Sequence, residues 1–156
     1  MCIIMKFLEK DLEDIICEGF INHTAKNQLL NRGLTLFDRH LFYKRQLRID
    51  GVGIADLVIY HRNPYYQDHI HVCVIELKRG TISNQTIYQC NRYIHGITRY
   101  LDSRNINHTI NGCVIGNKSI IDMREIEREE LHMINSYTYD YKVDGISFIY
   151  KELFNV

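Results

Sequence analysis

The chain has 156 residues, of which 46% are hydrophobic and 24% are charged. A chain of this length can bury a hydrophobic core of its own, so we expect a single domain over residues 1–156. Lys and Arg together number 19, as do Asp and Glu. This balance argues against an unselective nucleic-acid coat protein, although a local basic face is compatible with it.

The cysteines and the apolar runs favour a cytoplasmic protein. The five cysteines (Cys2, Cys17, Cys73, Cys90 and Cys113) are odd in number and widely spaced, which predicts reduced thiols in the core. No pair forms a C-x-x-C motif, so neither a zinc ribbon nor an iron–sulfur cluster is expected. The start of the chain lacks the pattern of a secretion signal, and no apolar run reaches the roughly 18 residues of a membrane span.

The first half of the sequence predicts two helices and then three strands. The helices are expected over about residues 7–18 and 23–32, and the strands over 36–49, 52–60 and 69–78. Apolar residues at helical spacing mark the first helix, and Gly33 would end the second. Asp50-Gly51 joins the first two strands as a hairpin, and the only proline, Pro64, lies in the turn before the third.

The second half predicts a long helix, a buried strand, and an appended helix and strand. These elements are expected over about residues 83–101, 110–115, 122–134 and 145–150. Ser83 is a suitable N-cap for the long helix, and the strand at 110–115 is apolar on both faces, as inside a sheet. The order α-β-β-β-α-β, with a C-terminal helix and strand, predicts an α/β fold with a mixed central sheet flanked by helices.

Three charged residues on neighbouring strands form the strongest candidate site. Asp56 lies in the second predicted strand, and Glu76 and Lys78 occupy alternate positions of the third. Because strand side chains alternate between faces, Glu76 and Lys78 share a face, and we expect Asp56 to lie beside them. Carboxylate oxygens suit Mg²⁺ or Mn²⁺, which polarises a phosphate and activates a bound water.

A purely structural interpretation of these residues stays open. Asp56 could simply end the hairpin, and Glu76 and Lys78 could form an exposed ion pair. The apolar run Val72-Cys73-Val74-Ile75 argues against this, because a central strand rarely carries two charges on one face without a use. For the eight histidines, a partly exposed strand face is a better explanation than a zinc site.

The order of elements and the motifs together resemble the PD-(D/E)xK (restriction-endonuclease-like) nuclease superfamily. The resemblance covers about residues 6–116, leaving a C-terminal extension over 117–156, and the closest likeness is to NucS-type and related DUF91 endonuclease domains. The segments that carry it are Glu9-Lys10-Asp11-Leu12-Glu13-Asp14, Arg45-Gln46, Gly53-Ile54-Ala55-Asp56-Leu57-Val58, Val74-Ile75-Glu76-Leu77-Lys78-Arg79-Gly80 and Gln89-Cys90-Asn91-Arg92-Tyr93. The last segment also has the Q-x-x-x-Y spacing of RecB-like nucleases. Ala55 stands where the superfamily often has proline.

The resemblance implies a metal-binding role for several acids. Asp56 and Glu76 would bind the ion through their carboxylates, and Leu77 through its backbone carbonyl. Either Glu9 or Glu13 of the first helix could complete the metal shell, although an exposed helix surface is the favoured interpretation of Glu9.

The resemblance also implies which residues act on the substrate. Lys78 would orient the attacking water or stabilise the developing negative charge, and Gln89 would face the site as a further catalytic residue. Arg79, Arg92 and Tyr93 would contact the DNA backbone.

These expectations describe a Mg²⁺- or Mn²⁺-dependent deoxyribonuclease, preferably an endonuclease, that hydrolyses phosphodiester bonds with an activated water. The resemblance supplies DNA as the substrate, whereas residue spacing alone would allow RNA. It also implies a homodimer, and a partner protein could supply substrate choice. We expect neither a small-molecule cofactor nor a membrane partner. Two alternatives remain: a Holliday-junction-resolving or restriction-type endonuclease of the same superfamily, and a non-catalytic nucleic-acid-binding or assembly module on this fold.

Overall fold

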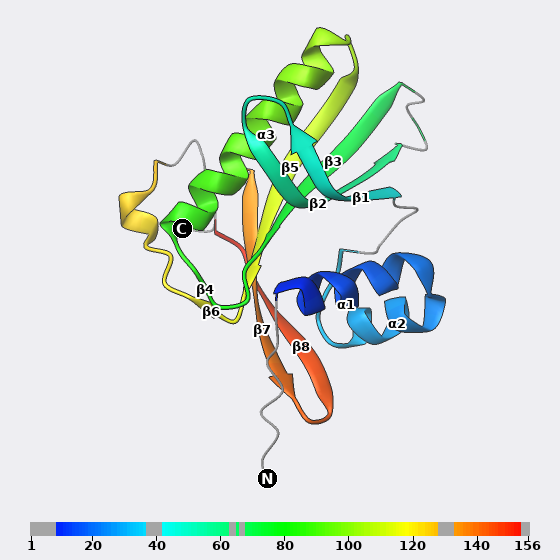
Figure 1. Ribbon diagram of the computed structural model, residues 1–156, viewed down its shortest axis with the longest axis vertical. Helices are drawn as coiled ribbons and strands as arrows, with labels where there is room; N and C mark the ends of the chain where they lie inside the picture. The colour runs from blue at the N-terminus through cyan, green and yellow to red at the C-terminus, as the bar shows by residue number, and fades with distance from the viewer. Residues whose placement is uncertain (1–8, 37–41, 63–64, 66–67, 128–132, 154–156) are drawn as a thin grey trace.

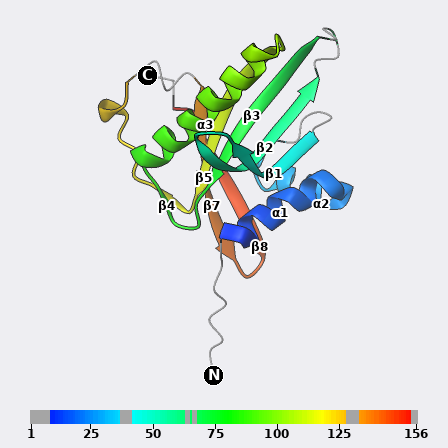
Figure 2. The same cartoon turned by 45° about the horizontal axis from the view of Figure 1, so that its top comes forward.

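The computed structural model describes residues 9–36, 42–62, 65, 68–127 and 133–153. Within them a mixed six-stranded sheet lies between helices, as expected for an α/β fold. Helices α1 (Glu9–Ile21) and α2 (His23–Asn31) cover one face of the sheet, and α3 (Asn84–Ser103) crosses the other (Figure 1, Figure 2). We call these the α1 face and the α3 face. None of the described helices has the length and apolar character that crossing a membrane would require.

The sheet joins an N-terminal meander to a C-terminal hairpin. Its order is β1-β2-β3-β5-β7-β8, and the strands are β1 (Phe42–Ile49), β2 (Gly53–Arg62), β3 (His69–Leu77), β5 (Asn107–Gly116), β7 (Ile134–Lys142) and β8 (Gly145–Lys151). The pairs β3–β5 and β5–β7 are parallel, and the other pairs are antiparallel. Helix α3 forms the crossover from β3 to β5. Two short strands, β4 (Thr81–Ile82) and β6 (Lys118–Ser119), form a separate parallel pair.

The elements expected before residue 117 are confirmed. The short strand β4 was not predicted. Asp50 and Gly51 lie in the turn between β1 and β2. Ser83 is the N-cap of α3, and its amide donates a hydrogen bond to the Thr86 hydroxyl at 3.0 Å. Residues 37–41, at the start of the first predicted strand, lie outside the described residues.

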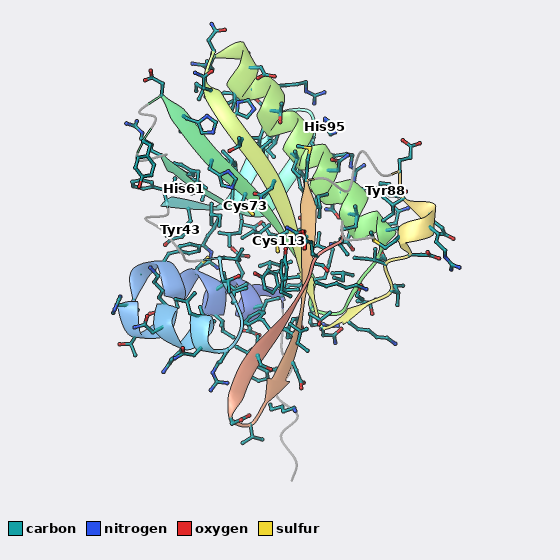
Figure 3. The ribbon with its side chains drawn as sticks, turned by 180° about the vertical axis from the view of Figure 1, so that it is seen from behind. Tyr43, His61, Cys73, Tyr88, His95 and Cys113 are labelled. Carbon is teal, nitrogen blue, oxygen red and sulfur yellow. The ribbon has the colours of Figure 1, made fainter. Side chains whose placement is uncertain are left out.

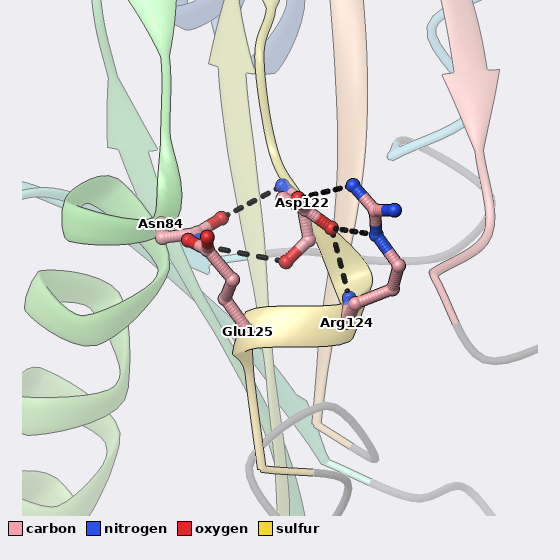
Figure 4. A network of polar contacts seen from close by, with 4 residues as sticks. All are labelled: Asn84, Asp122, Arg124 and Glu125. Atoms are coloured by element: carbon pink, nitrogen blue, oxygen red, sulfur yellow. Dashed lines mark hydrogen bonds and ion pairs between the residues drawn. The ribbon is translucent and has the colours of Figure 1, made fainter.

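The helix predicted over residues 122–134 is wrong. Among the described residues, Met123–Glu125 form a single 3-10 turn, and β7 already begins at Ile134. Asp122 explains the short turn, because its carboxylate accepts from the Arg124 amide at 3.0 Å while its own amide donates to Asn84 of α3 at 2.9 Å (Figure 4). The charged segment is therefore a capped turn attached to α3, and residues 128–132 lie outside the described part.

Two strands, β7 and β8, stand where a single appended strand was expected. Tyr137 and Tyr139 of β7 are buried at alternate positions and join Ile146 and Phe148 of β8 in the core on the α1 face. This period of two is the pattern of a strand with one buried face. The tyrosine hydroxyls make the segment Ile134–Lys142 polar in composition, which concealed the pattern in the sequence.

Four of the cysteines are buried in the two cores, as expected. Cys17, Cys73, Cys90 and Cys113 are free thiols, and Cys73 and Cys113 lie on neighbouring strands (Figure 3). Burial raises the pKa of the Cys73 thiol to about 12, so this group stays protonated and unreactive at neutral pH. Cys2 lies outside the described residues.

The end of α2 is fastened to the edge strand β8. The Phe148 amide donates to the Arg32 carbonyl at 2.8 Å, and the Arg32 guanidinium donates to the Ile146 carbonyl at 3.2 Å. Gly33 permits this approach, because its φ of 101° favours glycine and a side chain there would collide with the Phe148 carbonyl. The position of α2 against the sheet thus depends on this glycine.

Gly33→Ala should lower the free energy of unfolding by about 2 kcal/mol or more, since it adds a backbone collision to an unfavourable φ. The matched control is Gly51→Ala, where φ is 75° but no atom lies within 4 Å of the added Cβ. The control should lose only about 1 kcal/mol. Urea unfolding measured by circular dichroism compares the variants, and equal losses would contradict a close contact between Gly33 and β8.

Candidate active site

The acids and the lysine singled out in the sequence meet at the end of β3. The antiparallel register of β2 and β3 places Asp56 next to Glu76. The Asp56 carboxylate accepts a hydrogen bond from the Leu77 amide at 2.9 Å. Lys78 follows β3 directly, and its Nζ lies 3.4 Å from Glu76 Oε1. Two carboxylates and one ammonium therefore share a small region of the sheet.

Strand β2 changes face at Asp56. Ala55 packs in the core on the α3 face, whereas Leu57 packs in the core on the α1 face. Residues two apart in a regular strand share a face, so the alternation is interrupted between them. The interruption keeps Asp56 out of both hydrophobic cores and lets its carboxylate reach the Leu77 amide.

Strand β1 changes face at Gln46, which lies directly across the β1–β2 ladder from Asp56. Tyr43 packs against the core on the α1 face and Leu47 against the core on the α3 face, although regular alternation would put both on one face. The register of the two strands leaves Gln46 opposite Asp56. Gln46 has a φ of 49°, a left-handed conformation that is costly for a residue other than glycine. Backbone strain of this kind is concentrated at functional sites.

Arg45 and Gln46 connect helix α1 to the site. Arg45 Nε donates to Glu13 Oε1 at 2.7 Å, and the Gln46 side-chain amide donates to Glu13 Oε2 at 3.0 Å. The same amide lies 3.5 Å from Asp56 Oδ1. Both oxygens of the buried Glu13 are thus engaged, and this carboxylate holds Gln46 beside Asp56.

Gln46 received no role in the sequence analysis, although Arg45-Gln46 was among the segments that carried the resemblance. Its position in the hairpin could have indicated a role. Counting back across the Asp50-Gly51 turn puts Gln46 opposite Asp56.

Glu76 is the most unusual charged group of the site. Its side chain is 3% exposed, and Oε2 is buried with no hydrogen-bond partner in the described part of the chain. The pKa of Glu76 is raised to about 7, first by burial and then by the Asp56 charge, against the opposing effect of Lys78. Burial also raises the pKa of Asp56, which the hydrogen bond from the Leu77 amide opposes. Together the two carboxylates carry more negative charge than Lys78 balances.

The donor atoms of this site fit a hard divalent cation. The carboxylates of Asp56 and Glu76 and the carbonyl of Leu77 would hold it, and the unpartnered Glu76 oxygen would gain a bond that the described protein groups do not supply. Over residues 9–36, 42–62, 65, 68–127 and 133–153, no three His, Cys, Asp or Glu side chains form a group that could hold a metal ion. An ion here would therefore depend on two carboxylates, a carbonyl and water, a combination that suits Mg²⁺.

The two candidate acids of α1 have different surroundings. Glu13 is occupied by Arg45 and Gln46, as described above. Glu9 is exposed at the start of α1, and its charge adds to the raised pKa of Glu76. Of the two, Glu9 is the one with a carboxylate not already bound by Arg45 and Gln46.

The two polar residues predicted on α3, Gln89 and Tyr93, are bonded to each other. Gln89 Nε2 donates to the Tyr93 hydroxyl at 3.1 Å, and neither side chain has a hydrogen bond to Asp56 or Glu76 among the described residues. Tyr93 is 6% exposed, and its ring packs so close to Gly53 that a Cβ there would come within 3.3 Å. The Gln89–Tyr93 pair therefore rests on the start of β2.

The two arginines predicted to contact DNA are exposed. Arg79 follows Lys78, and its carbonyl accepts from the Tyr139 hydroxyl. Arg92 is exposed on α3, one residue before the buried Tyr93. Both guanidinium groups therefore remain accessible to an anionic ligand.

The strand histidines line a half-buried part of the α1 face. His71 Nδ1 and His69 Nε2 lie 2.6 and 3.2 Å from the Thr109 hydroxyl, and the ring centroids of His61 and His71 are 5.1 Å apart. This arrangement agrees with the interpretation of these histidines as a partly exposed strand face.

Stability should depend on pH through Glu76. Its folded pKa of about 7 exceeds the unfolded value of 4.5, so the stability that it contributes is complete below pH 4.5 and is lost as the pH rises through 7. Between pH 4.5 and 8, the free energy of unfolding of the wild type should fall by about 2–3 kcal/mol relative to that of Glu76→Gln, which cannot ionise. Urea unfolding of both proteins in EDTA between pH 4.5 and 8 measures the difference. A difference that does not vary with pH would contradict a buried, titrating Glu76.

The left-handed backbone at Gln46 is tested by a pair of substitutions. Gln46→Gly and Gln46→Ala both remove the bonds to Glu13 and Asp56. The left-handed φ at this position is unfavourable for alanine but not for glycine. Gln46→Gly should therefore be the more stable of the two by about 1 kcal/mol in urea unfolding. Equal stability of the two variants would mean that Gln46 is not left-handed in solution.

Comparison with protein-family models, with curated proteins and with solved structures finds no match to this chain.

Proposed function

We propose that this protein is a divalent-metal-dependent phosphodiester hydrolase that acts on DNA. The observation that carries the proposal is the buried Glu76 carboxylate, whose Oε2 lacks a partner among the described residues and whose pKa is raised to about 7. Burying such a group costs stability, so a fold that retains it without a ligand-binding use would be unusual. A bound cation would satisfy the oxygen and favour its ionised form.

The residues of the site have complementary parts in such a reaction. Mg²⁺ or Mn²⁺, when bound, polarises a phosphate and lowers the pKa of a water molecule. Asp56 is fixed by the Leu77 amide, and Glu76 by its burial, so both donors are oriented in advance. Lys78, 31% exposed beside Glu76, can place its ammonium against the negative charge that develops on a phosphate under attack.

The distribution of charge supports a polyanionic substrate. Neutrality of the whole chain conceals an imbalance, because between Phe42 and Ile121 Lys and Arg outnumber Asp and Glu. The basic residues there are Lys44, Arg45, Arg48, Arg62, Lys78, Arg79, Arg92, Arg99, Arg104 and Lys118, and the acidic ones are Asp50, Asp56, Asp68, Glu76 and Asp102. Arg45 is already paired with Glu13, and Lys78 lies beside Glu76, so the other basic residues are the ones available to phosphates.

A nuclease assay with Mg²⁺ or Mn²⁺ on labelled DNA tests the proposal. Asp56→Asn and Glu76→Gln should each lower the cleavage rate by roughly 100-fold or more, because each removes a charged donor while preserving shape. Glu18→Gln, on the exposed side of α1, is the matched control and should cleave as the wild type does. Cleavage in EDTA, or full activity in both site variants, would refute the mechanism.

Metal binding gives a second readout that does not need turnover. Calorimetric titration with Mn²⁺ should show binding to the wild type that strengthens as the pH rises toward 7, since the ion must displace the proton of Glu76. Glu76→Gln should lose this binding. Metal binding without cleavage on four-way, flapped and linear DNA would favour a non-catalytic module, whereas cleavage of one of these DNAs identifies the substrate.

A further inference from the structure

A groove lies on the α3 face, away from the carboxylates. Its volume is about 700 Å³, and it is bounded by the C-terminal half of α3 and by β1, β2 and β3. Aliphatic side chains such as Val58, Val72 and Ile97 form its floor. A space of this size, apolar inside and open to solvent at its rim, is typical of a ligand-binding site.

The rim of the groove is basic. Lys44 and Arg48 from β1 and Arg99 from α3 line it, and all three are exposed. Asp50 is the single acid among the lining residues. The three cations come from elements on opposite sides of the groove, so a ligand lying in it would meet positive charge from both walls.

Aromatic rings stand at the same rim. Tyr100 of α3 is 56% exposed, and the Arg104 guanidinium lies 5.2 Å from its ring centroid, which fixes one face of the ring. Tyr60 of β2 stacks on Phe42 with centroids 5.6 Å apart, and Phe42 is 58% exposed. Exposed rings interleaved with Arg and Lys along an apolar groove are the pattern of single-stranded nucleic-acid binding.

We propose that this groove binds single-stranded nucleic acid, with an unpaired base against Tyr100 and the apolar floor and with backbone phosphates on Lys44, Arg48 and Arg99. Charge complementarity selects this ligand, because a strand supplies flat apolar bases and a regular series of anions together. An uncharged apolar peptide would leave the cations unused. The inference rests on the proposed function only in taking the bound strand as part of the substrate.

Strand β3 runs from the groove toward the carboxylates, and Val74 between them is fully buried against α3. Val72 in the groove and Glu76 in the site are four positions apart on β3, which corresponds to about 13 Å. A strand with its cut phosphate at Glu76 and a base in the groove would have to pass outside α3, so its unpaired segment would span more than this distance. The preferred substrate would then carry an unpaired segment next to the cleavage point.

Fluorescence anisotropy with a labelled 12-nucleotide oligothymidylate, in EDTA so that no cutting occurs, tests the binding. Arg99→Glu and Arg48→Glu should each weaken binding about tenfold or more and should make it less dependent on salt. Lys151→Glu, an equal change of charge on the exposed edge strand β8, is the matched control and should bind as the wild type does. Circular dichroism confirms that each variant is folded.

Stacking is tested separately from charge. An oligonucleotide with 2-aminopurine at one position should lose fluorescence on binding, and Tyr100→Ala should weaken binding about tenfold, whereas Tyr100→Phe should retain it. The chain contains no tryptophan to complicate the signal.

Several results would overturn the proposal. Affinity unchanged in Arg99→Glu and Tyr100→Ala would do so, as would an equal loss in Lys151→Glu, which would indicate general charge attraction. Blunt duplex bound as tightly as the single strand, with no effect of Tyr100→Ala, would also exclude a base in the groove. Because binding is measured without metal, it can succeed when cleavage fails, and cleavage can succeed when groove binding fails.

Discussion

The hydrogen bond from the Leu77 amide to the Asp56 carboxylate fixes where two strands place their charges. It lies at the end of β3, and there a side-chain carboxylate takes the place of a backbone acceptor. Asp56, which makes this bond, lies where β2 departs from regular alternation, and Gln46 across the ladder has a left-handed backbone. The register of β2 and β3 brings Asp56 beside Glu76, and Gln46 at this departure from strand geometry links the site to Glu13 of α1.

The arrangement of Asp56 and Glu76 that suits a bound cation lowers the stability of the fold when no cation is present. Two acids with raised pKa values lie together, and the buried Glu76 Oε2 has no partner among the described residues. Ionising them in the absence of a cation costs folding free energy, and a bound cation would return it. Interactions outside the site must offset this unfavourable free energy. The ion pair between Arg45 and Glu13, at 2.7 Å, is one of them.

The parts of the fold that the sequence predicted are those with local causes. Asp50-Gly51 makes a hairpin and Ser83 caps a helix through bonds to nearby residues. Strand β7 was missed because its burial depends on β5, a distant partner, and its tyrosines combine apolar rings with polar hydroxyls. In the candidate site, the meeting of Asp56, Glu76 and Lys78 follows from register and period alone. The left-handed conformation of Gln46 could not be predicted, because its side-chain partners Glu13 and Asp56 come from other elements.

The bonds between Arg32 and β8 also bear on how the sheet ends. An exposed edge strand offers unpaired amides and carbonyls on which another chain can add a strand, with aggregation as a consequence. On β8 the Phe148 amide and the Ile146 carbonyl are already occupied by Arg32. The opposite edge, β1, carries Lys44, Arg45 and Arg48, and charged side chains on an edge disfavour strand addition. Strand addition is therefore disfavoured at both edges of the sheet, at β8 by hydrogen bonds to Arg32 and at β1 by charged side chains.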